Sequence, residues 1–445
     1  MGTGTPANQP LIIPRSEHPI SRAQISSNAL KVLYRLRSAG HRACLVGGGV
    51  RDLLLGREPK DFDVATDAYP EQVHALFRNC RLVGRRFRLA HIQFGPEIIE
   101  VATFRAFASG EEDSTSAQIH LDHHGRIISD NVYGGIEEDA QRRDFTINAL
   151  YYDIDNFSVL DYTSGLEDLR SGLIRLIGDP TQRYREDPVR MLRAVRFAAK
   201  LGFRIHADAE APLLKLGPLL ESIPPARLFD EVLKLFLGGH AVQTFELLRH
   251  YHLFGHLFPS TERCLARQAQ HFPKTLLVHA LTNTDARIAE DKPVAPAFLF
   301  AALLWEPLRE HWAALQNDET PELEALETAA DHVLQAQLNH IALPRRYGIP
   351  LREIWLMQTR FTARTGSRPA RLIAHPRFRA AYDFLLLRAA VDDSLAELAQ
   401  WWTAFLDANE DGRKAAIRSL SKPVARNRPR RQRMPRRRTK PAVTD

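Results

Sequence analysis

Three consecutive glycines, Gly47, Gly48 and Gly49, separate a short apolar run from a segment with helical spacing, and the next apolar run carries Asp61 and Asp63. A glycine turn between a strand and a helix lets backbone N–H groups approach a phosphate closely. Residues two apart on a strand point to the same face, so both carboxylates are predicted to face one side of a sheet. Two such carboxylates can hold a divalent cation through oxygen ligands. No Gly-Lys-Ser or Gly-Lys-Thr follows the glycines, which excludes a Walker A loop.

The first 185 residues mix short β-like runs with helical spacings. Helices are predicted over residues 28–39 and 70–78, and strands over 43–46, 62–65, 80–83, 89–94 and 98–103. This mixture predicts an α+β head with a mixed sheet and helices. Beyond about residue 185, helical patterns dominate and strand-like runs are scarce. The rest of the folded chain is therefore predicted to be all-helical.

The basic excess of the chain is confined to its last residues. The 445 residues carry a formal net charge of +7, but residues 422–445 alone carry +9, so the remainder sums to −2. Four prolines and dense like charge prevent a packed element there, which predicts a disordered tail. The tail holds eight arginines and two lysines, a balance that favours phosphate binding over solubility alone.

Several classes of protein are excluded by composition. The longest uninterrupted apolar run is Ala297–Trp305, and a membrane span needs roughly 18 apolar residues. Three widely spaced cysteines form neither a disulfide framework nor a zinc pattern. The first residues lack a basic stretch followed by an apolar one, so a signal peptide is not predicted. We therefore expect a cytoplasmic protein without a membrane span.

Two further blocks place arginine beside carboxylate. Arg142, Arg143 and Asp144 stand together before an apolar segment. The arginines can bind a triphosphate while the carboxylate orients a guanidinium, although a surface ion pair is the alternative. Asp187 and Arg190 stand three apart at the start of a helical pattern and so share a face.

Taken in order, these blocks resemble the class II template-independent nucleotidyltransferases, the family of bacterial poly(A) polymerases and CCA-adding enzymes. The likeness rests on the glycine and Asp-x-Asp blocks, the run from Ile98 to Arg105, the Arg-Arg-Asp block, and the run from Arg185 to Ala199. It is strong over about residues 28–205. The resemblance implies a polymerase-β-like head, a helical neck that reads the incoming base, and a helical body.

The resemblance also implies chemistry and site residues. It implies Mg²⁺ as cofactor, with ATP and RNA 3′ ends as substrates. The catalytic set would be Asp61, Asp63 and Asp144, and the metal ligands Asp61, Asp63 and Glu100, although Glu100 can also be read as a solvated strand carboxylate. The nucleotide-binding residues would be Gly47, Gly48, Arg51, Arg143, Asp187, Arg190 and Arg193.

The neck residues suit adenine. Adenine presents an N6 donor beside an N1 acceptor, which a carboxylate at Asp187 and a guanidinium at Arg190 match. Arg193, one step further along that row, is placed to meet the base or the phosphates. Asp187 is also a good helix N-cap, and that interpretation stays open.

Within the family, the choice lies between poly(A) polymerase and CCA-adding enzyme. The basic turn containing Arg85 and Arg86 and the arginine-rich tail resemble poly(A) polymerases, and we expect RNA binding there. The tail residues concerned are Arg430, Arg431, Arg436, Arg437 and Arg438. CCA addition is the alternative activity, and a non-catalytic RNA-binding adaptor is a distant one. Partners among RNA-degradation or RNA-chaperone proteins are also implied.

The predicted organisation has five parts. They are a flexible arm (1–25), a nucleotidyltransferase head (26–170), a neck for base recognition (171–240), a helical RNA-binding body (241–420) and the disordered basic tail (421–445).

Truncation after Ser421 should weaken RNA binding and flatten its dependence on salt, while short primers are still extended. Each lost phosphate contact should reduce the slope of log K against log salt by roughly 0.7 on single strands. Binding titrations of the full and truncated chains at several salt concentrations measure this slope. An unchanged slope would assign the tail to solubility or protein binding.

Overall fold

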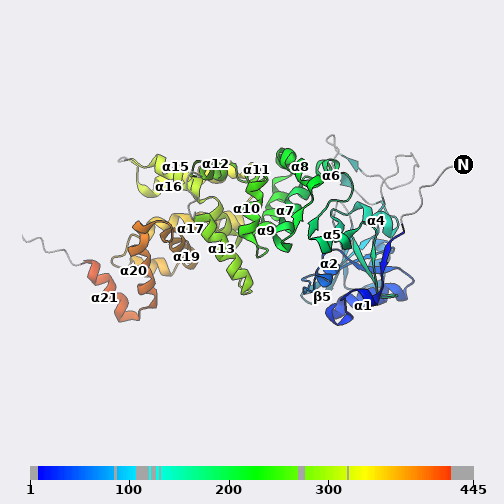
Figure 1. Ribbon diagram of the computed structural model, residues 1–445. Coiled ribbons are helices and arrows are strands. Elements are labelled where there is room, and N and C mark those ends of the chain that lie inside the picture. Colours follow the sequence, from blue (N-terminus) through cyan, green and yellow to red (C-terminus); the bar gives the residue numbers. More distant parts are fainter. Residues whose placement is uncertain are drawn as a thin grey trace, which may run out of the picture. The chain divides into compact units, whose positions relative to one another are not determined.

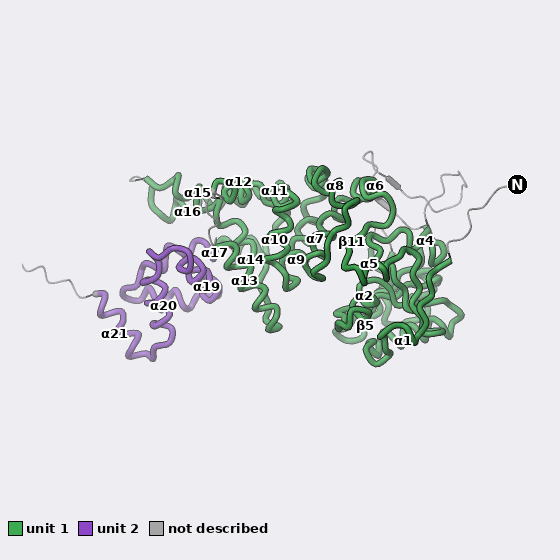
Figure 2. Tube along the Cα trace, viewed as in Figure 1, with its two compact units in different colours: residues 1–352 green, residues 353–445 purple. Residues whose placement is uncertain are grey.

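The computed structural model describes residues 9–84, 88–106, 120–121, 127–129, 132–268, 276–317 and 320–421. Arg85, Arg86 and all the predicted RNA-binding arginines of the tail lie outside these residues. The chain divides into two compact units at Arg352 and Glu353, as Figure 2 shows. The predicted helical body, 241–420, is thus divided between the two units.

An eight-stranded mixed sheet forms the head, which confirms the predicted α+β class (Figure 1). Its spatial order is β1-β10-β9-β2-β3-β6-β5-β4, and only the β3–β6 pair is parallel. The strands are β1 Leu11–Ile13, β2 Ala43–Val46, β3 Asp63–Thr66, β4 Cys80–Val83, β5 Leu89–Phe94, β6 Glu97–Thr103, β9 Leu150–Asp153 and β10 Ser158–Asp161. Strand β2 is buried along its whole length, as its unbroken apolar run requires.

The N-terminal segment differs from the predicted flexible arm. Leu11–Ile13 is a strand that pairs antiparallel with β10. Ser21 begins a short 3-10 helix, Arg22–Gln24, with a capping box. His18 Nε2 also lies 2.9 Å from the carbonyl oxygen of Phe157. Three apolar residues between prolines are too short a run to show a strand period, which is why the sequence did not indicate this edge strand.

Helix α1 begins at a side-chain cap, and the head helices end where glycine or extended backbone follows. The Ser26 hydroxyl accepts from the Ala29 N–H at 3.0 Å, which starts α1. Helix α1 then buries Leu33 and Leu36, together with Ala29 and Val32. The head helices are α1 Ser27–Ser38, α2 Gly48–Leu54, α3 Pro70–Leu76, α4 Ile136–Arg142 and α5 Gly165–Ser171.

The remainder of the first unit is helical, as predicted, apart from the short parallel pair β11 Leu173–Ile174 and β12 Arg204–Ile205. Helix α7 packs against α6, α9 and α10. The helices are α6 Pro180–Glu186, α7 Val189–Leu201, α8 Ala207–Leu216, α9 Pro225–Phe236, α10 Ala241–His250, α11 Phe254–Leu257, α12 Pro259–Gln268, α13 Leu276–Ala289, α14 Pro296–Leu303, α15 Trp305–Leu315 and α16 Glu322–Leu338. Helix α17 (Arg345–Arg360) crosses into the second unit.

The second unit has its own aromatic core. Trp402 is fully buried and packs against Phe361, Phe378 and Phe405, and its indole N–H donates to the Phe361 carbonyl at 2.9 Å. The helices are α18 Arg368–Ile373, α19 Phe378–Ala389, α20 Ala396–Asp407 and α21 Glu410–Ser421. Across the described ranges of both units, every helix is too short or too polar to cross a membrane.

Candidate active site

The glycine turn brings a carboxylate and a guanidinium together. Gly47 follows β2 with φ +75°, a conformation that disfavours side chains. A Cβ on Gly47 would lie 3.7 Å from Asp63 Oδ2 and 3.8 Å from Arg143 Nη1. At Gly49 a Cβ would lie 3.3 Å from the Asp61 carbonyl oxygen. The turn therefore has an acidic and a basic side chain close to the same point of its backbone.

The two aspartates and Glu100 are brought together by strand register. Asp63 is the first residue of β3, and the parallel register pairs it with Glu100 on β6. Asp61 lies two residues before the strand rather than on it, which corrects the predicted strand at 62–65. Burial, then the charge of Glu100, raises the pKa of Asp63 to about 6, with Asp61 adding to this and Arg143 opposing it. Three like charges therefore act on one another here.

These carboxylates do not form a complete metal cage. In the part of the chain that the structure describes, no group of three or more His, Cys, Asp and Glu side chains could hold a metal ion. Glu100 lies across from His91 on β5, with Oε1 3.3 Å from Nε2. The donor set suits a hard cation that takes its other oxygens from water or phosphates.

Arg143 is fixed by neighbours on the same face of the sheet. Its Nε donates to Asp139 Oδ2 at 3.1 Å and to the Tyr151 hydroxyl at 2.9 Å, and Nη2 donates to Asp139 at 2.9 Å. Burial lowers the pKa of Arg143, but the charges of Asp139 and Tyr151 outweigh it and raise the pKa overall. Nη1 is left on the side of Gly47 and Asp63. The guanidinium is thus held in place for an anion at the turn.

The Asp144 carboxylate forms an ion pair with Arg193 of helix α7. Its Oδ2 accepts from Arg193 Nε at 2.6 Å and lies 2.5 Å from Nη2, so two guanidinium nitrogens share this one oxygen. Its Oδ1 accepts from the Phe145 N–H at 2.9 Å and from Asn148 at 3.3 Å. Burial raises the pKa of Asp144, but the Arg193 guanidinium outweighs it, so the pKa falls overall. These contacts place Asp144 with helix α7.

The Arg51 side chain also forms hydrogen bonds with other side chains of the protein. Its side chain is buried and donates to Asp52 at 2.8 and 2.7 Å and to Asn148 Oδ1 at 2.7 Å. Its guanidinium also lies 5.1 Å from the Phe197 ring, which Arg193 and Arg196 approach as well. Arg51 therefore joins α2, which follows the glycine turn, to the neck helix.

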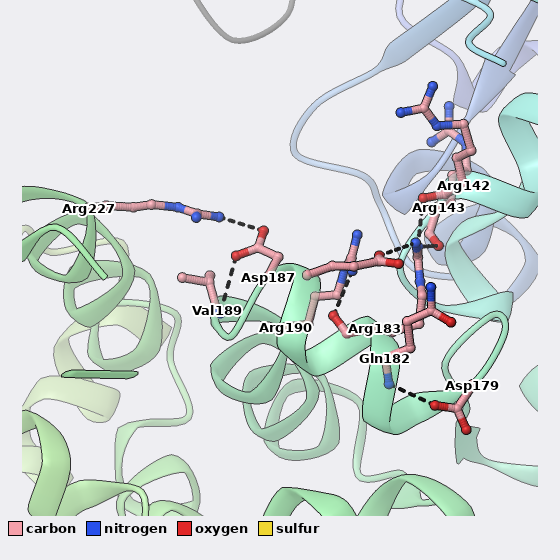
Figure 3. A network of polar contacts seen from close by, with 10 residues as sticks. Arg142, Arg143, Asp179, Gln182, Arg183, Asp187, Val189, Arg190 and Arg227 are labelled. Carbon is pink, nitrogen blue, oxygen red and sulfur yellow. Dashed lines mark hydrogen bonds and ion pairs between the residues drawn. The ribbon is translucent and has the colours of Figure 1, made fainter. Parts of the chain in front are cut away.

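Figure 3 shows that the two predicted base-reading residues have different partners. Asp187 Oδ2 accepts from Arg227 of α9 at 2.7 Å, and Oδ1 accepts from the Val189 N–H at 3.3 Å. Arg190 Nη1 instead donates to the Arg183 carbonyl at 2.7 Å and to Glu186 at 2.9 Å. Asp187 thus makes the predicted contact with the first turn of α7, and also a contact that the sequence did not predict.

Arg183 ties the neck to the Arg-Arg-Asp block. Its Nη2 donates to the carbonyls of Arg142 at 2.8 Å and Arg143 at 2.6 Å (Figure 3). Burial, then the charge of Arg190, lowers the pKa of Arg183 to about 10. Sequence reasoning missed both Arg183 and Arg227. Arg183 stands four residues before Asp187, and this spacing is the sequence feature that could have indicated its role. Nothing in the sequence links Arg227 to Asp187.

A glycine turn beside strand-borne carboxylates, with a neck helix bonded to the Arg-Arg-Asp block, defines a nucleotidyltransferase. The fold agrees: the chain is similar to a Bacillus stearothermophilus CCA-adding enzyme solved with CTP, at 25% identity and a TM-score of 0.54, over 89% of this chain and 87% of that one.

Sequence comparison gives the family. The chain is 52% identical to Poly(A) polymerase I of Salmonella typhi, over 96% of this chain and 93% of that protein. A CCA-adding enzyme of Leuconostoc mesenteroides is 40% identical, but over 49% of this chain and 52% of that protein. The chain therefore belongs to the bacterial poly(A) polymerase I family, and it is an enzyme.

Three family models match successive parts of the chain. The poly A polymerase head domain matches residues 43–175, and a probable RNA and SrmB-binding site of polymerase A matches residues 202–265. The polymerase A arginine-rich C-terminus matches residues 318–438.

Asp63→Asn should stabilise the metal-free protein at neutral pH. The folded-state pKa of about 6 lies above the ordinary 3.8, so the folded state binds more protons in that window and loses stability as pH rises through it. The effect at pH 7 should reach up to about 3 kcal/mol. Thermal unfolding in a chelator, between pH 4 and 7, measures it.

The difference between Asp63→Asn and the parent should vanish near pH 4. The exposed Asp61 offers a matched control, and Asp61→Asn should change stability much less. A variant that melts no higher than the parent at pH 7 would contradict the repulsion inferred at Asp63.

Proposed function

We propose that this enzyme adds AMP from ATP to RNA 3′ ends without a template and releases pyrophosphate. The observation that carries the proposal is that Asp63 Oδ2 and Arg143 Nη1 both lie within 4 Å of a Cβ placed on Gly47. A triphosphate at that turn would meet both a cation site and a guanidinium. The 52% identity to a protein named Poly(A) polymerase I supports the same activity.

Asp61 and Asp63 are the proposed ligands of Mg²⁺, with Glu100 beside them in register. When bound, two such ions would lower the pKa of the attacking 3′-hydroxyl and stabilise the leaving pyrophosphate. The raised pKa of Asp63 supports this assignment, because carboxylates that repel one another gain most from a cation between them.

Arg143 and the backbone of Gly47 and Gly48 are the proposed triphosphate site. The Asp139 and Tyr151 contacts hold Arg143 in one position, so little of its freedom is lost when a phosphate arrives. We propose Asp144 and Arg51 as positioning residues. Their contacts join the neck helix to the triphosphate side rather than to the reacting atoms.

We propose that Asp187 and Arg190 read the adenine edge, with Arg193 at the base or the phosphates. Arg227 donates to one oxygen of Asp187 at 2.7 Å, which anchors the carboxylate at the start of α7. A carboxylate held in one position favours a single base.

CCA addition is the second candidate, supported by the matching half of the Leuconostoc mesenteroides CCA-adding enzyme. The adaptor alternative requires the loss of an acidic residue or of the Arg-Arg-Asp block, and both are intact. The family model described as a probable RNA and SrmB-binding site supports RNA and a protein partner at residues 202–265.

Incubation of the purified chain with Mg²⁺, a generic RNA and each nucleotide separately tests the activity. ATP alone should give long ladders. Addition of one or two CMP residues to tRNA lacking its CCA end would instead support the second candidate.

Asp61→Ala and Asp63→Ala should each abolish incorporation, because the loss of a metal ligand removes several kcal/mol of transition-state stabilisation. A folded variant with near-parental turnover would refute that residue's assignment.

Asp187→Asn should weaken ATP use and reduce discrimination against UTP and GTP, while leaving the helix intact. Asparagine caps a helix as well as aspartate does, so a capping role alone predicts no change in nucleotide preference. Steady-state kinetics with each nucleotide measure the effect.

Asp179→Asn is the matched control for this prediction. The Asp179 carboxylate caps α6 by accepting from the Gln182 N–H at 2.7 Å (Figure 3). Its substitution should leave nucleotide preference unchanged. Equal effects of the two substitutions would make Asp187 a cap only.

A further inference from the structure

A cavity lies beside the segment that carries Asp144, apart from the carboxylates Asp61, Asp63 and Glu100. Its volume is about 330 Å³, within the range of small-molecule sites. Gln141, Thr163, Arg175, Ile177 and His206 are among its lining residues, and none of the site residues predicted from the sequence lines it. The cavity is therefore separate from the site residues predicted from the sequence.

Three side chains on the cavity wall carry hydrogen-bond donors for which no described residue supplies an acceptor. The Arg175 Nε donates to both oxygens of Asp168, at 3.1 and 3.0 Å, but no described residue accepts from its two terminal nitrogens. The Thr163 hydroxyl is buried without a partner. His206 Nδ1 accepts from the Asp208 N–H at 3.3 Å, which leaves the ring proton on Nε2 as a donor.

The other groups on the wall limit what fits. Asp208 is the one carboxylate of the lining, and its side chain is 75% exposed at the mouth, 3.4 Å from His206 Nδ1. Gln141 donates to the Tyr162 carbonyl at 3.3 Å. Leu176, Ile177, Pro180 and Ala209 supply apolar surface. The wall suits an anionic head on a small body.

The structure assigns this cavity to a phosphate group. A guanidinium fork with free terminal nitrogens matches phosphate oxygens, and an unpaired buried hydroxyl and an imidazole N–H supply further donors. The group can come from a small phosphorylated metabolite or from the phosphates of an RNA chain. The site goes beyond the proposed polymerase activity and does not depend on it.

The cavity wall is also bonded to the Arg-Arg-Asp block. The Thr146 N–H donates to the Arg175 carbonyl at 3.0 Å, and the Ile177 N–H donates to the Asp144 carbonyl at 3.1 Å. A ligand on Arg175 therefore contacts the segment whose Asp144 side chain holds Arg193. These bonds connect the cavity wall to the segment that is paired with the neck helix.

Titration of the full chain with ribose 5-phosphate, without divalent cations, tests the assignment by calorimetry. This probe has no base, so it avoids the adenine pocket. Thr163→Val should weaken binding about three- to tenfold, the effect of one hydrogen bond, while the free protein melts no lower than the parent. His206→Asn keeps the cap on α8 and should weaken binding as well. Thr282→Val, on the exposed face of α13, is the control and should bind as the parent does.

Parental binding of the probe by both Thr163→Val and His206→Asn would overturn the assignment. Displacement of the probe by ATP, with probe binding unaffected in Thr163→Val, would also overturn it. So would a clear loss of melting temperature in free Thr163→Val. Fluorescence anisotropy with a single-stranded RNA separates the two sources. Weaker RNA binding by Thr163→Val identifies the RNA chain as the source of phosphate, and unchanged RNA binding identifies a small phosphorylated molecule.

Discussion

The ion pair between Asp144 and Arg193 is the contact on which the arrangement of the head and neck depends. It joins a residue of the Arg-Arg-Asp block to α7 through two guanidinium nitrogens on one carboxylate oxygen, and Arg183 adds two bonds to the carbonyls of that block. Both partners of the pair are largely buried. Loss of either would leave the other charged and desolvated, which typically costs 3–5 kcal/mol. The two sides proposed to bind triphosphate and base are thus built as one body.

The carboxylate side of the site is assembled against a local electrostatic cost. Asp63 is mostly buried beside Glu100 and Asp61, and Arg143 only partly offsets their repulsion. A protein selected for stability alone would replace one of these groups. Their retention fits a general property of active sites, in which groups are held in positions that favour function over stability.

Much of the head could be predicted from local patterns. The glycine turn, Asp61, Asp63 and most strands lie within short segments whose periods and turn residues are visible in the sequence, and β5 and β6 occur where expected. The rest depends on pairings between distant residues. Asp187 and Arg227 are forty positions apart, Asp144 and Arg193 forty-nine, and β1 pairs with a strand near residue 160. In the sequence, an arginine that stays at the surface cannot be distinguished from one that forms an ion pair in the folded protein.

Helix α7 sets a fixed length between its two functional ends. Asp187 stands just before the helix, Arg193 lies six residues on, and Phe197, with arginines around its ring, lies one turn further. A single-residue insertion between Asp187 and Arg193 would move one end by about 1.5 Å and rotate it by about 100° relative to the other. Evolution can therefore exchange side chains along α7 one at a time, but it cannot lengthen or shorten this span without separating the two ends of the proposed nucleotide site.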